Sequence, residues 1–139
     1  MISITESFCA DRLLALAEAE IDPTANDVRS TVWDRAATTT VSTWEGIRGG
    51  YRDWFQIKPN WPSLEPLVEV RNAIAHGLGN LTRIQKKNPQ GVRDKLALAG
   101  ITLDEDRVLL DEADITQIRS VCVALVVEID ELVQARSVE

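Results

Sequence analysis

The residue best suited to chemistry in this 139-residue chain is its single histidine, His76. A histidine has a reference pKa of about 6.5, so it can accept or donate a proton near neutral pH. Asn72 precedes it by four residues and shares its face if this segment is helical. Arg71 must extend its long side chain to join them, and its guanidinium offers a planar fork to oxyanions. Together these three side chains are a candidate group for proton transfer and anion binding.

A structural role for these residues is the alternative. A lone histidine is more often a surface residue or a satisfied core residue than a catalytic one. Arg71 and Asn72, however, stand in a stripe of Val, Ile and Ala, where polar side chains are expensive to bury. Polar groups at these positions therefore need a reason beyond packing.

A basic strip includes and follows this group. Residues 71–95 hold six basic side chains against one acidic side chain, net +5, whereas the whole chain carries −7. Such a strip on an acidic molecule is a candidate polyanion site, although charge alone favours a solvated loop between helices. Glu65 and Glu69 lie just upstream and would repel a polyanion if they faced the same site. We expect both of them to be exposed to solvent.

The elements that must position these residues are helical. The apolar periodicity predicts a first helix over residues 5–20 and a second helical region over 24–57. Ser63 is expected to cap a third helix, Asn88–Pro89 to open a short fourth helix that ends at about Ala99, and Asp114 to begin the last helix. Residues 101–103 and 108–110 are expected to pair as a small β-hairpin. The predicted fold is all-α, an up-down bundle of four main helices with the short helix and the hairpin before the last helix.

Each main helix has an expected buried stripe. In the second region it is Val41, Trp44, Ile47, Tyr51, Trp54 and Phe55; in the third, Leu64, Leu67, Val68, Ile74 and Leu78; in the last, Ile115, Ile118, Cys122, Leu125, Ile129 and Leu132. Gly49–Gly50 interrupts the second stripe and is expected to bend the helix or to admit another backbone. Trp33 and Trp61 fit core packing, a dimer contact or a base-stacking surface, with packing favoured.

The sequence Arg71-Asn72-x-x-x-His76 resembles the Arg-x(4–6)-His motif of the HEPN superfamily, which often carries a polar residue after the arginine. The motif stands late in the third predicted main helix of an all-α chain and is followed by a glycine-rich end. The downstream run, from Leu81 through Lys86–Lys87 to the final amphipathic helix, is similar to the RiboL-PSP-type HEPN branch. The resemblance covers roughly residues 5–135, and residues 69–83 match in detail.

The resemblance implies a homodimer in which two Arg-His motifs face one cleft. It implies a metal-independent endoribonuclease of a prokaryotic toxin–antitoxin or phage-defence system, with Arg71, Asn72 and His76 in the active site. Arg83, Lys86 and Lys87 are then candidates for binding flanking RNA phosphates. The alternative is a non-catalytic HEPN module that binds a nucleotide or a partner protein. One departure is Leu78, because HEPN toxins with nucleotidyltransferase antitoxins carry there the tyrosine that the antitoxin modifies.

Length and composition set the remaining bounds. A chain of 139 residues predicts one domain, residues 1–139, with a core large enough to need no disulfide or metal. Cys9 and Cys122 are expected to be reduced core residues of a cytoplasmic protein. Neither a membrane span nor a secretory signal is expected. The two cysteines and the histidine fit no common zinc pattern, so we expect no metal or other cofactor.

Overall fold

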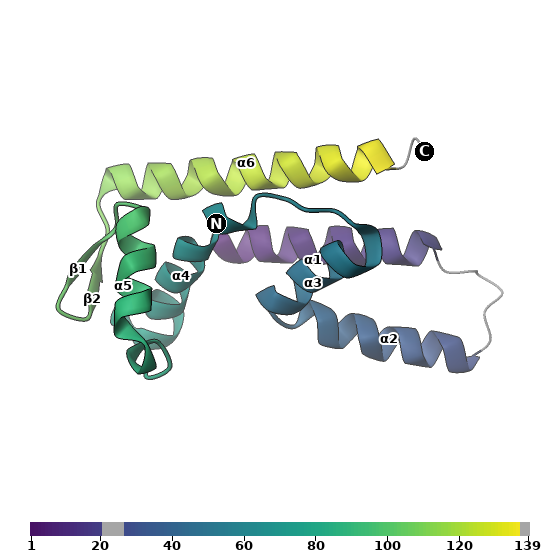
Figure 1. Ribbon diagram of the computed structural model, residues 1–139, viewed down its shortest axis with the longest axis horizontal. Helices are drawn as coiled ribbons and strands as arrows, with labels where there is room; N and C mark the ends of the chain where they lie inside the picture. Colours follow the sequence, from purple (N-terminus) through teal and green to yellow (C-terminus); the bar gives the residue numbers. More distant parts are fainter. Residues whose placement is uncertain (21–26, 137–139) are drawn as a thin grey trace. The chain divides into compact units, whose positions relative to one another are not determined.

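The computed structural model describes residues 1–20 and 27–136. In these ranges the chain forms six α-helices, two short 3₁₀ turns and one two-stranded antiparallel sheet (Figure 1). The elements in order are α1 (Ile2–Glu20), α2 (Asp27–Val41), α3 (Trp44–Phe55), η1 (Trp61–Ser63), α4 (Glu65–Gly77), η2 (Gln85–Lys87), α5 (Pro89–Leu98), β1 (Thr102–Asp104), β2 (Arg107–Leu109) and α6 (Glu112–Arg136). The predicted helical class and the predicted hairpin are confirmed.

The chain divides into two compact units. The first comprises Met1–Ser3 and Asn60–Leu125, and the second comprises Ile4–Pro59 and Val126–Glu139. Helix α6 contributes its first part to one unit and its remainder to the other. A single domain over residues 1–139 stays a prediction.

In the second unit, α1 and α3 approach closely because of Gly50. A Cβ atom at Gly50 would lie 2.6 Å from a methyl group of Leu13, so only glycine fits this contact. Nearby, the Tyr51 hydroxyl donates a hydrogen bond to the carbonyl of Cys9 at 2.8 Å. Arg12 on α1 forms an ion pair with Asp130 on α6. The atoms that approach Gly50 belong to the side chains of Leu13 and Thr40, so the expected approach of another backbone is not found, and the helix continues through Gly49–Gly50.

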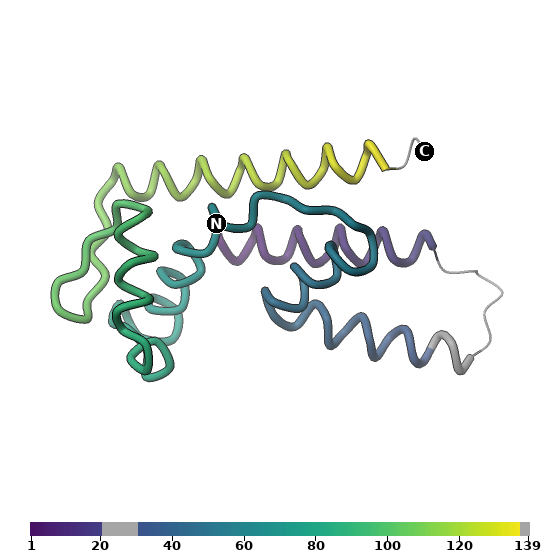
Figure 2. Tube along the Cα trace, viewed as in Figure 1, coloured from purple at the N-terminus to yellow at the C-terminus, as the bar shows by residue number. Residues whose placement is uncertain are grey.

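The break in the second predicted helical region lies elsewhere. Helix α2 ends at Val41 and α3 begins at Trp44, so the region predicted over 24–57 is helical but consists of two helices (Figure 2). Its predicted start at residue 24 lies outside the described residues. Thr43 is extended and accepts a hydrogen bond from the Gly46 N–H at 3.1 Å, which caps α3. A Cβ atom at Gly46 would lie 2.0 Å from the Thr40 carbonyl oxygen. The turn therefore depends on a glycine that the apolar pattern gave no reason to single out.

The tryptophans follow their predictions in part. Trp61 is buried, whereas Trp54, expected in the core, is partly exposed and packs against Trp33 with ring centroids 5.5 Å apart. Trp33, Trp54 and Phe55 line a hollow of about 320 Å³ in the second unit. The expectation that Trp54 lies in the core was wrong because its face of α3 carries this open aromatic cluster.

The first unit is built around α4, α5 and the hairpin. Asn88 caps α5 by accepting from the Gly91 N–H at 3.1 Å, and Gly100, just beyond the helix, has a positive φ. The hairpin register pairs Leu103 with Val108. Two backbone bonds attach the segment after α4 to the hairpin: Leu81 N–H to the Asp106 carbonyl at 2.8 Å, and Val108 N–H to the Gly79 carbonyl at 2.9 Å. The hairpin thus fixes the path of the chain as it leaves α4.

Two helix starts differ from the predictions. Ser63 lies in η1, where its hydroxyl donates to the Asn60 carbonyl, so it does not cap α4. Asp111 and Asp114 cap α6 reciprocally, each carboxylate accepting from the other's backbone N–H, and the helix begins at Glu112.

Cys122 on α6 and Cys9 on α1 are buried free thiols, as expected. Among the residues described, no helix is long and apolar enough to cross a membrane.

Tyr51 is the only tyrosine, and burial raises the pKa of its phenol. The fold favours the neutral phenol, so this stabilisation is complete below the unfolded pKa of about 10 and is lost as the pH rises above it. We expect the tyrosinate absorbance at 295 nm to appear together with loss of helical circular dichroism, above pH about 10. Tyrosinate that forms near pH 10 while the helices persist would contradict this.

Candidate functional site

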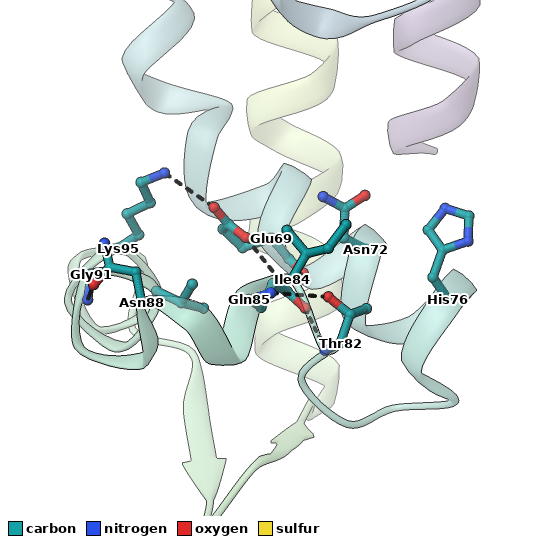
Figure 3. Close-up of a pocket in the computed structure, with 10 residues that line it drawn as sticks. Glu69, Asn72, His76, Thr82, Ile84, Gln85, Asn88, Gly91 and Lys95 are labelled. Atoms are coloured by element: carbon teal, nitrogen blue, oxygen red, sulfur yellow. Dashed lines mark hydrogen bonds and ion pairs between the residues drawn. The ribbon is translucent and has the colours of Figure 1, made fainter.

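Arg71, Asn72 and His76 lie in the second half of α4. The Arg71 guanidinium donates from Nη1 to Asn72 Oδ1 at 2.9 Å, and both side chains are half-buried. His76, one turn further on, is exposed. Asn72 and His76 line one hollow, as their four-residue spacing predicted (Figure 3). Arg71 does not line this hollow and is linked to it by its bond to Asn72.

The hollow has a volume of about 460 Å³ and lies within the first unit. Its walls come from α4, from η2 and the turn before it, and from α5. In Figure 3, Asn72 and His76 lie to one side, while Asn88 and Lys95 lie to the other. A volume of this size falls in the range of about 300–1,000 Å³ that is typical of small-ligand sites.

Gln85 ties the hollow together. Its side chain is 6% exposed and donates from Nε2 to the carbonyl of Glu69 at 2.9 Å and to the Glu69 carboxylate at 2.8 Å. Its Oε1 accepts from the Thr82 N–H at 2.9 Å, and its own N–H donates to the Thr82 hydroxyl at 3.2 Å. A single buried amide thereby anchors the segment after α4 onto α4. Nothing in the sequence indicates this role, because a glutamine among basic residues is expected to lie at the surface.

Glu69 faces the hollow, contrary to its expected exposure to solvent. Its carboxylate is 16% exposed and pairs with Lys95 Nζ on α5 at 3.1 Å. The two partners are 26 residues apart, so helical spacing could not have joined them. Because Lys95 and Gln85 occupy its two oxygens, this carboxylate is partly neutralised at the site where it was expected to repel a polyanion.

The predicted phosphate-binding residues differ in their surroundings. Lys86 Nζ lies 2.8 Å from Asp106, and its hydrogen bond holds the pKa of that carboxyl below its usual value, with a further contribution from Arg93. Arg83 and Lys87 are exposed and have no polar partner among the residues that the structure describes. Two of the three predicted cations are thus open to a ligand, and the third is engaged by the hairpin.

Two apolar side chains that are close to His76 in the sequence are exposed. Ile74 and Leu78 were expected in the buried stripe of this helix, but Ile74 is 49% exposed and Leu78 is 92% exposed. Leu78 also adopts the left-handed conformation, with φ 52°, at the end of α4. That conformation costs a non-glycine residue about 1–2 kcal/mol. The prediction was wrong because apolar spacing marks a face without saying what covers it.

Within residues 1–20 and 27–136, no group of three or more His, Cys, Asp or Glu side chains is placed to hold a metal ion. No family model, curated protein or solved structure matches the chain.

The Gln85 network makes a prediction about stability. Gln85→Ala should lower the free energy of unfolding by about 2 kcal/mol, because it leaves the Thr82 N–H and the Glu69 groups without their buried partner. Gln85→Glu should cost at least as much, since it places a second carboxylate against Glu69. Urea denaturation followed by circular dichroism measures both.

Gln90→Ala is the matched control. Gln90 is exposed and bonds only to Asp94, one turn away on α5, at 2.7 Å. Its replacement should change stability by less than about 0.5 kcal/mol. Equal losses for Gln85→Ala and Gln90→Ala would mean that the buried network contributes nothing specific.

Proposed function

We propose that this chain is a metal-independent endoribonuclease that acts as a homodimer, with Arg71, Asn72 and His76 of each copy in one composite site. The observation that carries the proposal is the held pair Arg71–Asn72 beside an exposed His76 on an open hollow. Cleavage of a phosphodiester needs a guanidinium that is held in place and a histidine that can reach the ligand.

In this reaction the 2′-hydroxyl of a ribose attacks the adjacent phosphorus, and the bond from phosphorus to the 5′-oxygen breaks. One group takes the proton of the 2′-hydroxyl, and another returns a proton to the departing 5′-oxygen. The products are a 2′,3′-cyclic phosphate and a 5′-hydroxyl. His76 of one copy serves as the base and His76 of the other as the acid, while Arg71 stabilises the charge that builds up on the phosphate oxygens.

The second copy is proposed to cover the C-terminal end of α4, which carries His76. Ile74 and Leu78 add exposed apolar area to this end of the helix, and a symmetric dimer would remove it from water. The same proposal includes the up-down bundle of four main helices in a single domain, the HEPN resemblance, and a role in a prokaryotic toxin–antitoxin or phage-defence system with a cognate partner protein.

His76→Ala and Arg71→Ala should each abolish cleavage of total RNA in EDTA while the protein keeps its melting temperature. Loss of a proton-transfer group typically costs a factor of about 10²–10⁴ in rate. Arg71→Lys should also be impaired, because a point charge does not replace the planar fork. Gel analysis of the RNA and mapping of cyclic phosphate ends measure the effect.

Arg119→Ala is the matched control, an exposed arginine of the first unit with no polar partner in the described part of the chain. It should leave cleavage unchanged. RNA that stays intact with the unaltered protein would instead favour the non-catalytic module. Cleavage by His76→Ala at the unaltered rate would refute the catalytic assignment.

The protein should be a dimer in solution, with a mass about twice 15.4 kDa by light scattering at tens of micromolar. Leu78→Asp should shift it towards the monomer, because a charge replaces an apolar side chain at the proposed interface. The control Leu98→Asp changes a side chain that is 87% exposed on α5 and should leave the dimer intact. A monomeric unaltered protein would reject the composite site.

A further inference from the structure

The aromatic hollow of the second unit has a lining that the proposed nuclease does not use. Trp33, Trp54 and Phe55 line it, and its volume of about 320 Å³ lies at the lower end of the range typical of small-ligand sites. The Trp33 and Trp54 rings are tilted by 56°, and the Trp54 and Phe55 rings meet edge to face at 6.3 Å. Phe55 is buried, whereas Trp33 and Trp54 are partly exposed. Aromatic surface therefore remains open to a ligand.

One acidic and one basic side chain complete the polar part of this lining. Glu20 on α1 and Arg136 on α6 approach each other to 3.5 Å, which is long for a charge-assisted hydrogen bond. Arg136 also donates from Nη1 to the Phe55 carbonyl at 2.9 Å, and its guanidinium lies 5.1 Å from the centre of that ring. Within the described residues, these contacts use two of the five N–H donors of Arg136 and one of the two oxygens of Glu20.

Both charged groups are accessible to a ligand. The Glu20 side chain is 64% exposed and the Arg136 side chain is 39% exposed. In the described part of the chain, they are the only charged residues that line the hollow. The second unit as a whole is acidic, since residues 4–59 and 126–139 hold 13 acidic and seven basic side chains, and this disfavours an anion. The lining is therefore matched by a ligand with one charge of each sign beside an aromatic ring.

We propose that this hollow binds a free aromatic amino acid. The α-carboxylate pairs with the Arg136 guanidinium, the α-ammonium pairs with the Glu20 carboxylate, and the ring packs against Trp33 and Trp54. An α-amino acid carries both charges on one carbon atom, so it can reach two side chains that lie this close together. The proposal does not depend on the nuclease function, because every residue of this site belongs to the second unit.

Titration with L-phenylalanine tests the site through tryptophan fluorescence, excited at wavelengths that phenylalanine does not absorb. We expect a saturable change in the millimolar range. Phenethylamine lacks the carboxylate and phenylpropionate lacks the ammonium group, so each should bind about threefold to tenfold more weakly than L-phenylalanine. L-Alanine lacks the ring and should give no saturable change.

Glu20→Gln tests the partner of the ammonium group. It should weaken the binding of L-phenylalanine and phenethylamine by about threefold to tenfold and leave phenylpropionate unchanged, because only the first two ligands carry an ammonium group. Arg136→Gln should show the opposite selectivity and spare phenethylamine. The matched control is Glu18→Gln, an exposed glutamate of α1 that does not line the hollow and has no polar partner among the described residues. It should leave the affinity for every ligand unchanged.

The absence of a saturable response to L-phenylalanine would overturn the proposal. L-Alanine that binds as tightly would also overturn it, because the ring would then contribute nothing. So would phenethylamine and phenylpropionate that both bind as tightly as L-phenylalanine, because apolar packing alone would then explain binding. Full affinity for L-phenylalanine in a folded Glu20→Gln protein, or an equal loss in Glu18→Gln, would reject the placement of the ammonium group. If Arg136→Gln fails to fold, Glu20→Gln decides.

Discussion

The half-buried carboxylate of Glu69 is the group on which the site depends. It receives Lys95 from α5 and Gln85 from η2, so one side chain of α4 links three segments that are distant in sequence. Without these bonds η2 and α5 would lose their contacts with the Glu69 carboxylate of α4. An isolated carboxylate at this depth would be costly, and a lysine and an amide on its two oxygens remove most of that cost. The hollow next to His76 is therefore a consequence of the contacts that Lys95 and Gln85 make with this carboxylate.

The same pairing changes how the basic strip acts. The net charge of +5 includes every cation of the strip. In the fold, however, Lys95 pairs with Glu69, and Lys86 and Arg93 pair with Asp106. The two pairs with Asp106 are exposed and contribute little to stability, so they mainly reduce the charge that a ligand meets. Arg83 and Lys87 keep their full charge at the surface. Affinity for a polyanion would thus come from fewer side chains than the sequence suggests, with a correspondingly smaller dependence on salt.

Local signals predicted the local features well. Asn88–Pro89 marked the start of α5, and the hairpin formed where short β-prone runs flank three acidic residues. On α6, Ile118, Cys122, Leu125 and Ile129 are buried as their spacing required, whereas Ile115 of the same predicted stripe is exposed. One failure is local, because Ser63 lies in η1 instead of capping α4. The others depend on contacts that local spacing does not specify. The turn at Ser42–Thr43 depends on a close contact between Gly46 and Thr40, and the Glu69–Lys95 pair joins two helices. Ile74 and Leu78 satisfied the helical period and are nevertheless exposed, because periodicity cannot tell a core from a surface awaiting a partner.

The titratable groups around the hollow indicate whether one chain alone could supply both proton-transfer groups. Cleavage of a phosphodiester by proton transfer needs a base and an acid at the same time. The chain has one histidine, and the nearest other candidates, Glu69 and Lys95, are held to each other at 3.1 Å. Using either for proton transfer would break the pair that shapes the hollow. A second proton-transfer group for His76 is therefore best sought outside the chain, and in the proposed dimer a second copy would supply it together with a second Arg71.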